Sequence, residues 1–122
     1  MPLLMDYTQY LQARVIRTGC EWRLKIKVVS DAIGTFPEAA RFHCQFRAEN
    51  ENGVVLADLT SENGQIVRVD SDNNLEIILK QEDSAGWTCS KVVADIIRTD
   101  LAQRQHLGFD LEIPVKRTIT RP

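Results

Sequence analysis

Two histidines and three cysteines are the side chains of this chain that could ligate a metal or attack a substrate. A zinc site needs such side chains to converge, and close histidine spacings bring two of them together. His43 lies between Arg41 and Gln45 on the solvent side of a predicted strand, and His106 lies at a predicted turn. The sequence has neither a His-x-His nor a His-x-x-x-His spacing. We therefore expect two solvated surface histidines and no metal site.

The cysteines form no catalytic or disulfide pattern. Cys20, Cys44 and Cys89 are an odd number without a short-spaced pair, which favours neither a disulfide framework nor a thiol-zinc site. Cys44 follows His43 in a strand, so their side chains point to opposite faces and cannot act as nucleophile and base. The other cysteine–histidine pairings stay open. Cytosolic synthesis with reduced thiols is the simplest account of this cysteine pattern. We expect no catalytic residues and no enzyme.

An acidic run at residues 70–74 is superficially similar to a calcium loop. An EF-hand loop needs a glycine at its middle and a glutamate at its twelfth position, and counting from Asp70 that position is Gln81. The run is therefore predicted to be a polar turn. No phosphate-binding glycine motif is found in the sequence, and we expect no cofactor.

Trp22 and Trp87 could stack on a sugar ring if they were exposed. Trp22 is in phase with Leu24 and Ile26, which favours burial. Trp87 follows a glycine at the start of a strand, and its environment stays open. An exposed Trp87 would support a carbohydrate-binding module.

The composition is that of one globular domain. The 122 residues are 43% hydrophobic and 26% charged, and the formal net charge is -2 with acids and bases interspersed. That balance provides no broad basic field for nucleic acid or for a membrane surface. We expect no signal peptide, and no apolar run is long enough to span a bilayer. Lys116, Arg117 and Arg121 are predicted to form a solvated basic tail that could contact an acidic partner.

The elements that would position these residues are predicted to be strands. Apolar residues alternate with polar ones along residues 22–28, 40–48 and 107–113, as in a sheet with one buried and one wet face. Arg23, Lys25 and Lys27 should share such a wet face. Further short strands are expected near residues 14–17, 54–59, 66–69, 75–79 and 92–97, with Pro114 at an edge or interruption of the last strand. A helix competes with the strand only at 92–97, where β-branched residues favour the strand.

Turns are expected between these strands. Glu-Asn-Gly occurs at 51–53 and again at 62–64, and Asn-Gly predicts tight hairpins because both residues tolerate positive φ. Residues 30–37, 70–74 and 83–86 are predicted loops or turns. Residues 1–10 have helical spacing but could equally be an arm that orders on a partner. The expectation is an N-terminal helix or arm over 1–10 and an all-β, two-sheet antiparallel sandwich of seven to nine short strands over 11–122.

The order of these landmarks resembles a family of small bacteriophage and prophage proteins. The resemblance covers about residues 13 to 121, and it rests on turn and core residues in order and spacing rather than on one specific motif. Its elements are Ile16-Arg17-x-Gly19-x-x-Trp22, Phe46-Arg47, Leu56-Ala57-Asp58-Leu59-Thr60-Ser61-Glu62-Asn63-Gly64-Gln65-Ile66, Ala94-Asp95-Ile96, Val115 and Thr120-Arg121. The chain departs from the family at Ala94, which is normally aromatic, and at Asp100-Leu101-Ala102-Gln103, which replaces an Asp-Gly hairpin.

The resemblance implies a virion structural protein, associated with the tail, with an immunoglobulin-like sandwich similar to attachment domains of tail fibres and receptor-binding proteins. It implies synthesis in the bacterial cytoplasm, location in the virion, and partners that are other virion proteins and further copies of itself, not nucleic acid or membrane. It carries no catalytic or binding residues. The alternatives are a carbohydrate- or cell-surface-binding module and a regulatory protein encoded beside the structural genes.

Overall fold

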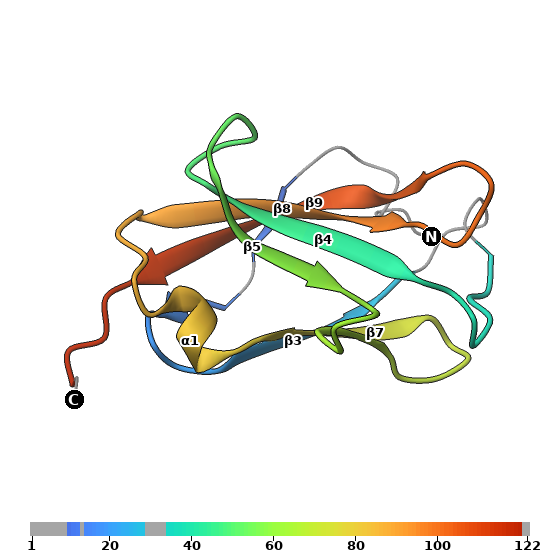
Figure 1. Ribbon diagram of the computed structural model, residues 1–122, viewed down its shortest axis with the longest axis horizontal. Coiled ribbons are helices and arrows are strands. Elements are labelled where there is room, and N and C mark those ends of the chain that lie inside the picture. Colours follow the sequence, from blue (N-terminus) through green and yellow to red (C-terminus); the bar gives the residue numbers. More distant parts are fainter. Residues whose placement is uncertain (1–9, 13, 29–33, 121–122) are drawn as a thin grey trace.

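The computed structural model describes residues 10–12, 14–28 and 34–120 as nine strands and one short helix (Figure 1). The predicted arm therefore lies outside the described residues except for Tyr10, and so does the loop segment 30–33. The elements are β1 (Tyr10–Gln12), β2 (Ile16–Arg17), β3 (Trp22–Lys27), β4 (Phe42–Ala48), β5 (Val55–Thr60), β6 (Ile66–Arg68), β7 (Asn74–Leu79), α1 (Gln81–Ser84), β8 (Lys91–Arg98) and β9 (Gln105–Lys116).

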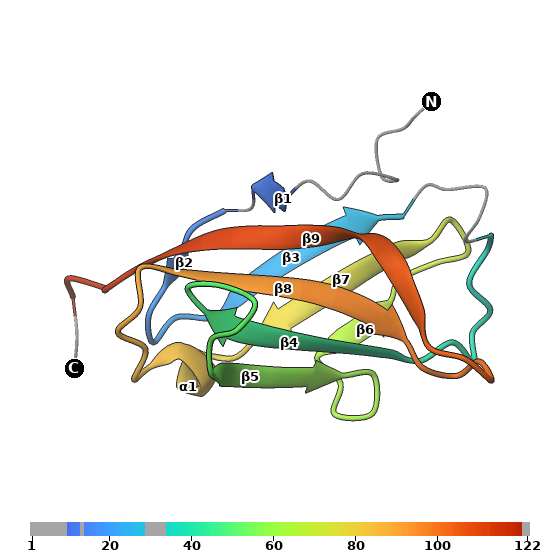
Figure 2. The same cartoon turned by 90° about the horizontal axis from the view of Figure 1, so that it is seen from above.

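The strands form two sheets packed face to face, which confirms the predicted all-β sandwich (Figure 2). The larger sheet has the order β1-β9-β8-β4-β5, with β2 also paired to β9, and the smaller sheet has the order β3-β7-β6. The pairing is antiparallel as predicted except at β1 and β2, which both run parallel to β9. Segment 92–97 is a strand within β8, so the competing helix is excluded. The immunoglobulin-like form of the sandwich stays a prediction at this point.

Pro114 lies inside β9, at the place where the neighbouring edge is broken. Glu112 is the last β9 residue paired to β1, and Val115 is the first paired to β2. The N–H of Val115 donates to Ser90 on the β8 side, so alternation points the nitrogen of Pro114 toward the gap between β1 and β2. The missing N–H of Pro114 therefore removes no hydrogen bond of the ladder with β8. Pairing is interrupted at Pro114 on the side of β1 and β2, as predicted, and continues on the side of β8.

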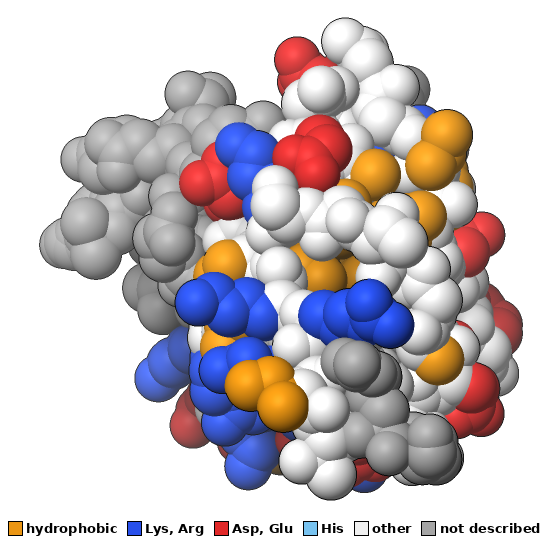
Figure 3. Space-filling view, turned by 90° about the vertical axis from the view of Figure 1, so that its left-hand side faces the viewer, with side chains coloured by type: hydrophobic (Ala, Val, Ile, Leu, Met, Phe, Trp, Pro, Cys, Tyr) orange, Lys and Arg blue, Asp and Glu red, His pale blue; other side chains and the backbone are white. Residues whose placement is uncertain are grey.

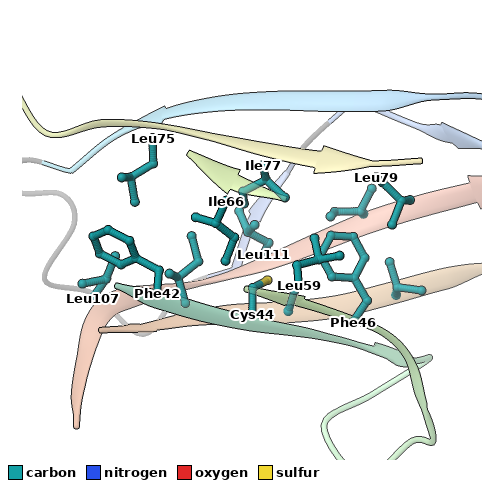
Figure 4. Close-up of a cluster of buried hydrophobic side chains, with 14 of the residues drawn as sticks. Phe42, Cys44, Phe46, Leu59, Ile66, Leu75, Ile77, Leu79, Leu107 and Leu111 are labelled. Carbon is teal, nitrogen blue, oxygen red and sulfur yellow. The ribbon is translucent and has the colours of Figure 1, made fainter. Parts of the chain in front are cut away.

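The core lies between the sheets, where the inward residues of both meet. Figure 4 shows Phe42, Cys44 and Phe46 of β4 facing Leu75, Ile77 and Leu79 of β7. Phe46 is fully buried and packs against both tryptophan rings. Its ring centroid lies 6.1 Å from that of Trp22 and 6.3 Å from that of Trp87. The alternation read from the sequence is thus the alternation between core and solvent.

The first Asn-Gly lies in the β4–β5 hairpin, but not as the tight two-residue turn that we expected. Residues 49–54 form the loop, and positive φ occurs at Glu49 (67°), not at Asn52 or Gly53. Gly53 is needed for a different reason. A Cβ added there would lie 1.8 Å from the carbonyl oxygen of Ala48. The glycine therefore allows the loop to return close to the strand that it left.

The second Asn-Gly does not form a hairpin at all, and that prediction is wrong. β5 pairs with β4 in the larger sheet, whereas β6 pairs with β7 in the smaller one. The turn at 61–65 therefore carries the chain from one sheet to the other. Gly64 takes a φ of 81°, and the side chain of Asn63 accepts hydrogen bonds from the N–H groups of Thr60 (3.2 Å) and Gln65 (3.0 Å). Local turn chemistry was identified correctly, but the partner strand was not.

The turn at 70–74 is the hairpin between β6 and β7, and its buried residue Asn73 anchors a distant loop. Asn73 has a φ of 61°. Its side-chain oxygen accepts from the N–H of Phe36 at 2.7 Å, and its amide donates to the carbonyls of Gly34 and Val28. One asparagine thus fixes the segment before β4 against the smaller sheet.

The first two residues of the predicted loop at 83–86 belong to the single-turn helix α1, and the last two form the turn after it. Asp83 stabilises this turn because its carboxylate accepts the N–H of Lys80 at 2.9 Å and the side-chain amide of Gln65 at 2.8 Å. Ser84 is fully buried, and its hydroxyl accepts the N–H of Gly19 at 2.9 Å. The helix therefore ties the turn before β3 to the end of β7.

Candidate functional site

The outer face of the larger sheet carries a row of polar side chains that crosses four strands. Asp58 on β5 lies opposite Gln45 on β4, Gln45 lies opposite Asp95 on β8, and Asp95 lies opposite Asp110 on β9. In β4, β8 and β9 the residues just before and just after the row residue point into the core, so the row faces outward. Strand pairing thus brings together carboxylates that are far apart in the sequence.

His106 lies between two of these carboxylates. Its Nε2 is 3.1 Å from Asp95 Oδ2 and 3.4 Å from Asp110 Oδ1. We expected His106 at a turn, and that prediction is wrong because β9 already begins at Gln105. The register between β8 and β9 shifts between Asp95 and Ile97, and Gly108 takes a φ of 94° beside this bulge. The bulge places the imidazole over the pair of aspartates.

The proton on His106 is positioned by the backbone. The N–H of Gly108 donates to His106 Nδ1 at 2.9 Å, so a neutral ring carries its proton on Nε2, facing the carboxylates. The three residues offer one nitrogen and two oxygen ligand atoms, all within 4.8 Å of one another. They are the one group among the described residues with the composition and spacing to hold a metal ion.

His43 lies on the same face, and its one ion-pair partner among the described residues is Asp58. The neighbouring Cys44 points into the core, as its position in the strand predicted, and burial raises the pKa of its thiol. Cys20 is exposed and Cys89 is half-buried. Across the described part of the chain no hydrogen bond joins a cysteine to a histidine. A nucleophile–base pair is thus not formed there.

A groove of about 940 Å³ opens at one end of the sandwich, where the ends of β2 and β9 meet the segment after α1. In the end-on view of Figure 3, Lys and Arg side chains gather on the lower half of this end, and apolar side chains show between them. Cys20, Trp87, Cys89, Arg117 and Thr118 are among the residues that line the groove. Its walls carry one aromatic side chain, several threonine hydroxyls, the guanidinium of Arg117 and the carboxylate of Glu82.

Both tryptophans are buried, which confirms the prediction for Trp22 and decides the open case of Trp87. Trp22 is 3% exposed, and its indole N–H donates to the carbonyl of Arg14 at 2.9 Å. Trp87 is 9% exposed and packs on Phe46. Neither ring therefore presents a free face to a sugar.

The predicted basic face is present, and it lies on the smaller sheet. Arg23, Lys25 and Lys27 all lie exposed along the outside of β3. Arg23 forms ion pairs with Glu21 (3.1 Å) and Glu76 (3.4 Å). No hydrogen bond or ion pair engages the side chain of Lys25 or of Lys27 within the part of the chain that the structure describes. Their charges are available to a partner.

The acidic run at 70–74 satisfies its own polar groups. Asp70 Oδ1 accepts from the N–H of Asp72 (2.9 Å) and from the side chain of Asn74 (3.0 Å). The hydrogen bond from Asn74 is the main cause of a lowered pKa at Asp70. These contacts are those of a closed polar turn.

No protein-family model matches the chain, and no curated protein sequence matches it either. The resemblance to phage and prophage proteins consequently stays a prediction. Among the described residues no helix is long and apolar enough to cross a membrane.

Proposed function

We propose that this chain is a non-enzymatic structural protein of a bacteriophage or prophage virion, associated with the tail, which docks to neighbouring virion proteins and to copies of itself. The order of its landmarks resembles the phage family, and the rigid two-sheet core suits a docking module. We also infer that the sandwich is immunoglobulin-like. In support, β3-β7-β6 and β9-β8-β4 follow the strand order B-E-D and G-F-C of that fold, with β5 at the C′ position.

The charge on the two outer faces is the observation that carries the docking proposal. The smaller sheet presents Arg23, Lys25 and Lys27, with Glu76 beside them. On the larger sheet, the outer face of β5, β4, β8 and the middle of β9 presents Asp58, Asp95, Asp110 and Glu112 against Arg47 and Lys91, while the basic Arg17 and Lys116 lie paired at its β2 end. The basic row of the smaller sheet and this acidic part of the larger sheet thus lie on opposite faces of one molecule.

Complementary faces on opposite sides favour head-to-tail contacts between copies. Such heterologous contacts generate rings when the rotation between neighbours closes and filaments when it does not. Because the charges are exposed, the contact should weaken as salt is raised. The same two faces are available to other virion proteins of matching charge.

Light scattering and sedimentation of two charge-reversed variants test this proposal. Lys25→Glu/Lys27→Glu removes the basic face, and Asp58→Lys/Glu112→Lys removes the acidic one. We expect the unmodified chain to assemble at low salt and each variant alone to be monomeric. An equimolar mixture of the two variants should assemble again, because its contacts are complementary both with the native signs and with both signs exchanged. A wild-type chain that is monomeric at low salt and binds no neighbouring virion protein would rule the proposal out.

The carbohydrate-binding alternative needs an aromatic ring at a groove with a free face. Trp87 lines the end groove, but its ring is nine-tenths buried against the core. We therefore do not propose that function.

A further inference from the structure

We propose that Asp95, His106 and Asp110 form a binding site for one divalent transition-metal cation of the Zn²⁺ class on the outer face of the larger sheet. The inference goes beyond the docking function and does not rest on it. It rests on the geometry of the three ligand atoms, on the lack of a lysine or arginine partner for the two aspartates among the described residues, and on the backbone that holds the histidine.

Both aspartate oxygens lie at the distance from His106 Nε2 that two ligands of one metal ion require, and all three ligand atoms lie within 4.8 Å of one another. Bonds from Zn²⁺ to imidazole nitrogen and carboxylate oxygen are about 2.0 to 2.2 Å, so neighbouring ligands of one ion lie roughly 3 to 3.5 Å apart. His106 Nε2 is 3.1 Å from Asp95 Oδ2 and 3.4 Å from Asp110 Oδ1. One nitrogen and two carboxylate oxygens form a ligand set that suits Zn²⁺ and its neighbours better than Ca²⁺.

The two aspartates are placed so that they require a positive charge. Asp95 and Asp110 are directly opposite in the β8–β9 register, where like charges are destabilising. In the described part of the chain neither aspartate forms an ion pair with lysine or arginine, and His106 is their common partner. A bound cation would neutralise this pair.

There is space beside the aspartates for the remaining ligands of the ion. A hollow of about 120 Å³ is lined by Asp95 and Asp110 together with Gln45, Arg47 and Glu51. Arg47 is engaged there by the carbonyl of Gly53 (2.9 Å) and the side chain of Gln45 (3.1 Å). Water could complete the coordination from this side, which leaves the ion accessible from solvent.

Metal binding must move the imidazole proton. In the structure Nδ1 accepts from the N–H of Gly108, and Nε2 bears the proton that faces the carboxylates. A metal-bound Nε2 supplies its lone pair, so the proton moves to Nδ1 and the hydrogen bond from Gly108 is lost. The hydrogen bond of the Gly108 amide therefore reports on ligation by His106. Binding through the carboxylates alone would leave Nδ1 free to accept it.

Titration of the full chain with Zn²⁺, followed by calorimetry and by ¹H–¹⁵N NMR, tests the proposal. Cys20→Ser/Cys89→Ser serves as the background, because accessible thiols also bind zinc. We expect one ion per chain, a shifted Gly108 amide, and binding that is weaker by roughly tenfold or more in each of Asp95→Asn, His106→Gln and Asp110→Asn. His43→Gln/Asp58→Asn is the matched control, since that pair offers only two ligands, and it should bind as the background does.

Three results would overturn the proposal: no saturable binding, equal weakening in the control pair, or an unshifted Gly108 amide with unchanged affinity in His106→Gln. All of these side chains lie on the sheet surface, and circular dichroism of each variant shows whether its fold is kept. Failure here leaves the docking proposal intact, because assembly can be measured with a metal chelator present and then does not depend on metal binding.

Discussion

Thr60 and Asn63 exchange a reciprocal pair of hydrogen bonds across the turn that follows β5. The N–H of Thr60 donates to Asn63 Oδ1 at 3.2 Å, and the N–H of Asn63 donates to Thr60 Oγ1 at 2.9 Å. Asn63 Nδ2 also donates to the carbonyl of Asp58 at 3.3 Å. Ser61 bonds to β4 through its N–H, so by alternation these groups of Thr60 and Asp58 face the open edge of the sheet. Asn63 therefore covers part of an edge that could otherwise pair with another strand.

Replacing this side chain should expose the edge. We expect Asn63→Ala to lower the free energy of unfolding by about 1 to 2 kcal/mol, since it removes hydrogen bonds to backbone groups, and to increase self-association. Urea denaturation and light scattering measure the two effects. Asn52→Ala, in the other Glu-Asn-Gly copy, is the control and should stay within about 0.5 kcal/mol of the unmodified chain. Equal losses in both variants would contradict the covering role of Asn63.

The two Asn-Gly glycines should respond differently to substitution. Gly64 has positive φ and open space around it, so Gly64→Ala should lower the free energy of unfolding by about 1 to 2 kcal/mol. Gly64→Asn should lower it less, because asparagine tolerates this conformation. Gly53 has no such φ but has no room for a Cβ, so alanine and asparagine should both cost more there. Thermal unfolding of the four variants measures the difference, and a mild Gly53→Asn would show that the loop relaxes.

Asp100 should make stability depend on pH in the acid range. Its carboxylate accepts Arg98 Nε (2.8 Å) and Nη2 (3.0 Å) and the N–H of Arg41. The hydrogen bonds from Arg98 lower the pKa of Asp100 to about 2. The folded pKa lies below the ordinary value of about 3.9, so the stabilisation is present above pH ~4 and is lost as the pH falls toward ~2.

Asp100→Asn is accordingly expected to lower the free energy of unfolding by about 1.5 kcal/mol at neutral pH. This value is at the low end for a hydrogen bond to a charged group, because Asp100 borders solvent. The difference from the unmodified chain should shrink as the pH falls from about 4 to about 2. Urea midpoints at a series of pH values measure it, with the exposed turn variant Asp72→Asn as control. A difference that does not change with pH would show that the carboxylate charge contributes nothing.

Tryptophan fluorescence should report two protected rings. We expect blue-shifted emission and weak quenching by acrylamide in the native chain, because Trp22 and Trp87 pack on Phe46. Trp22→Phe isolates the signal of Trp87 at the end groove. If this remaining ring were quenched as strongly as in the urea-unfolded chain, the groove would present an open aromatic face, and the carbohydrate-binding alternative would regain its support.

Period-two alternation was enough to predict most strands and their faces. Arg23, Lys25 and Lys27 are exposed and Cys44 is buried because successive side chains of a strand point to opposite sides. This is a local property of the backbone, so it can be recognised without knowing which strands pair. The one-turn helix α1 was missed because four residues are too few to show a helical period.

Pairing was beyond the reach of such patterns. The turn at 61–65 has the residues of a hairpin, but whether the next strand returns to the same sheet depends on which sheet has a free edge and a matching apolar face. That is decided by packing between the sheets and not by the turn itself.

The sequence by itself determined an all-β sandwich, its wet and buried faces, and the residues able to do chemistry. Only the tertiary structure decided which of those residues meet. Asp95 and Asp110 become opposite neighbours through the β8–β9 register, and the bulge at Gly108 then places His106 between them. Register and bulge position arise from the packing of whole strands, since a shift of one residue would turn these side chains into the core.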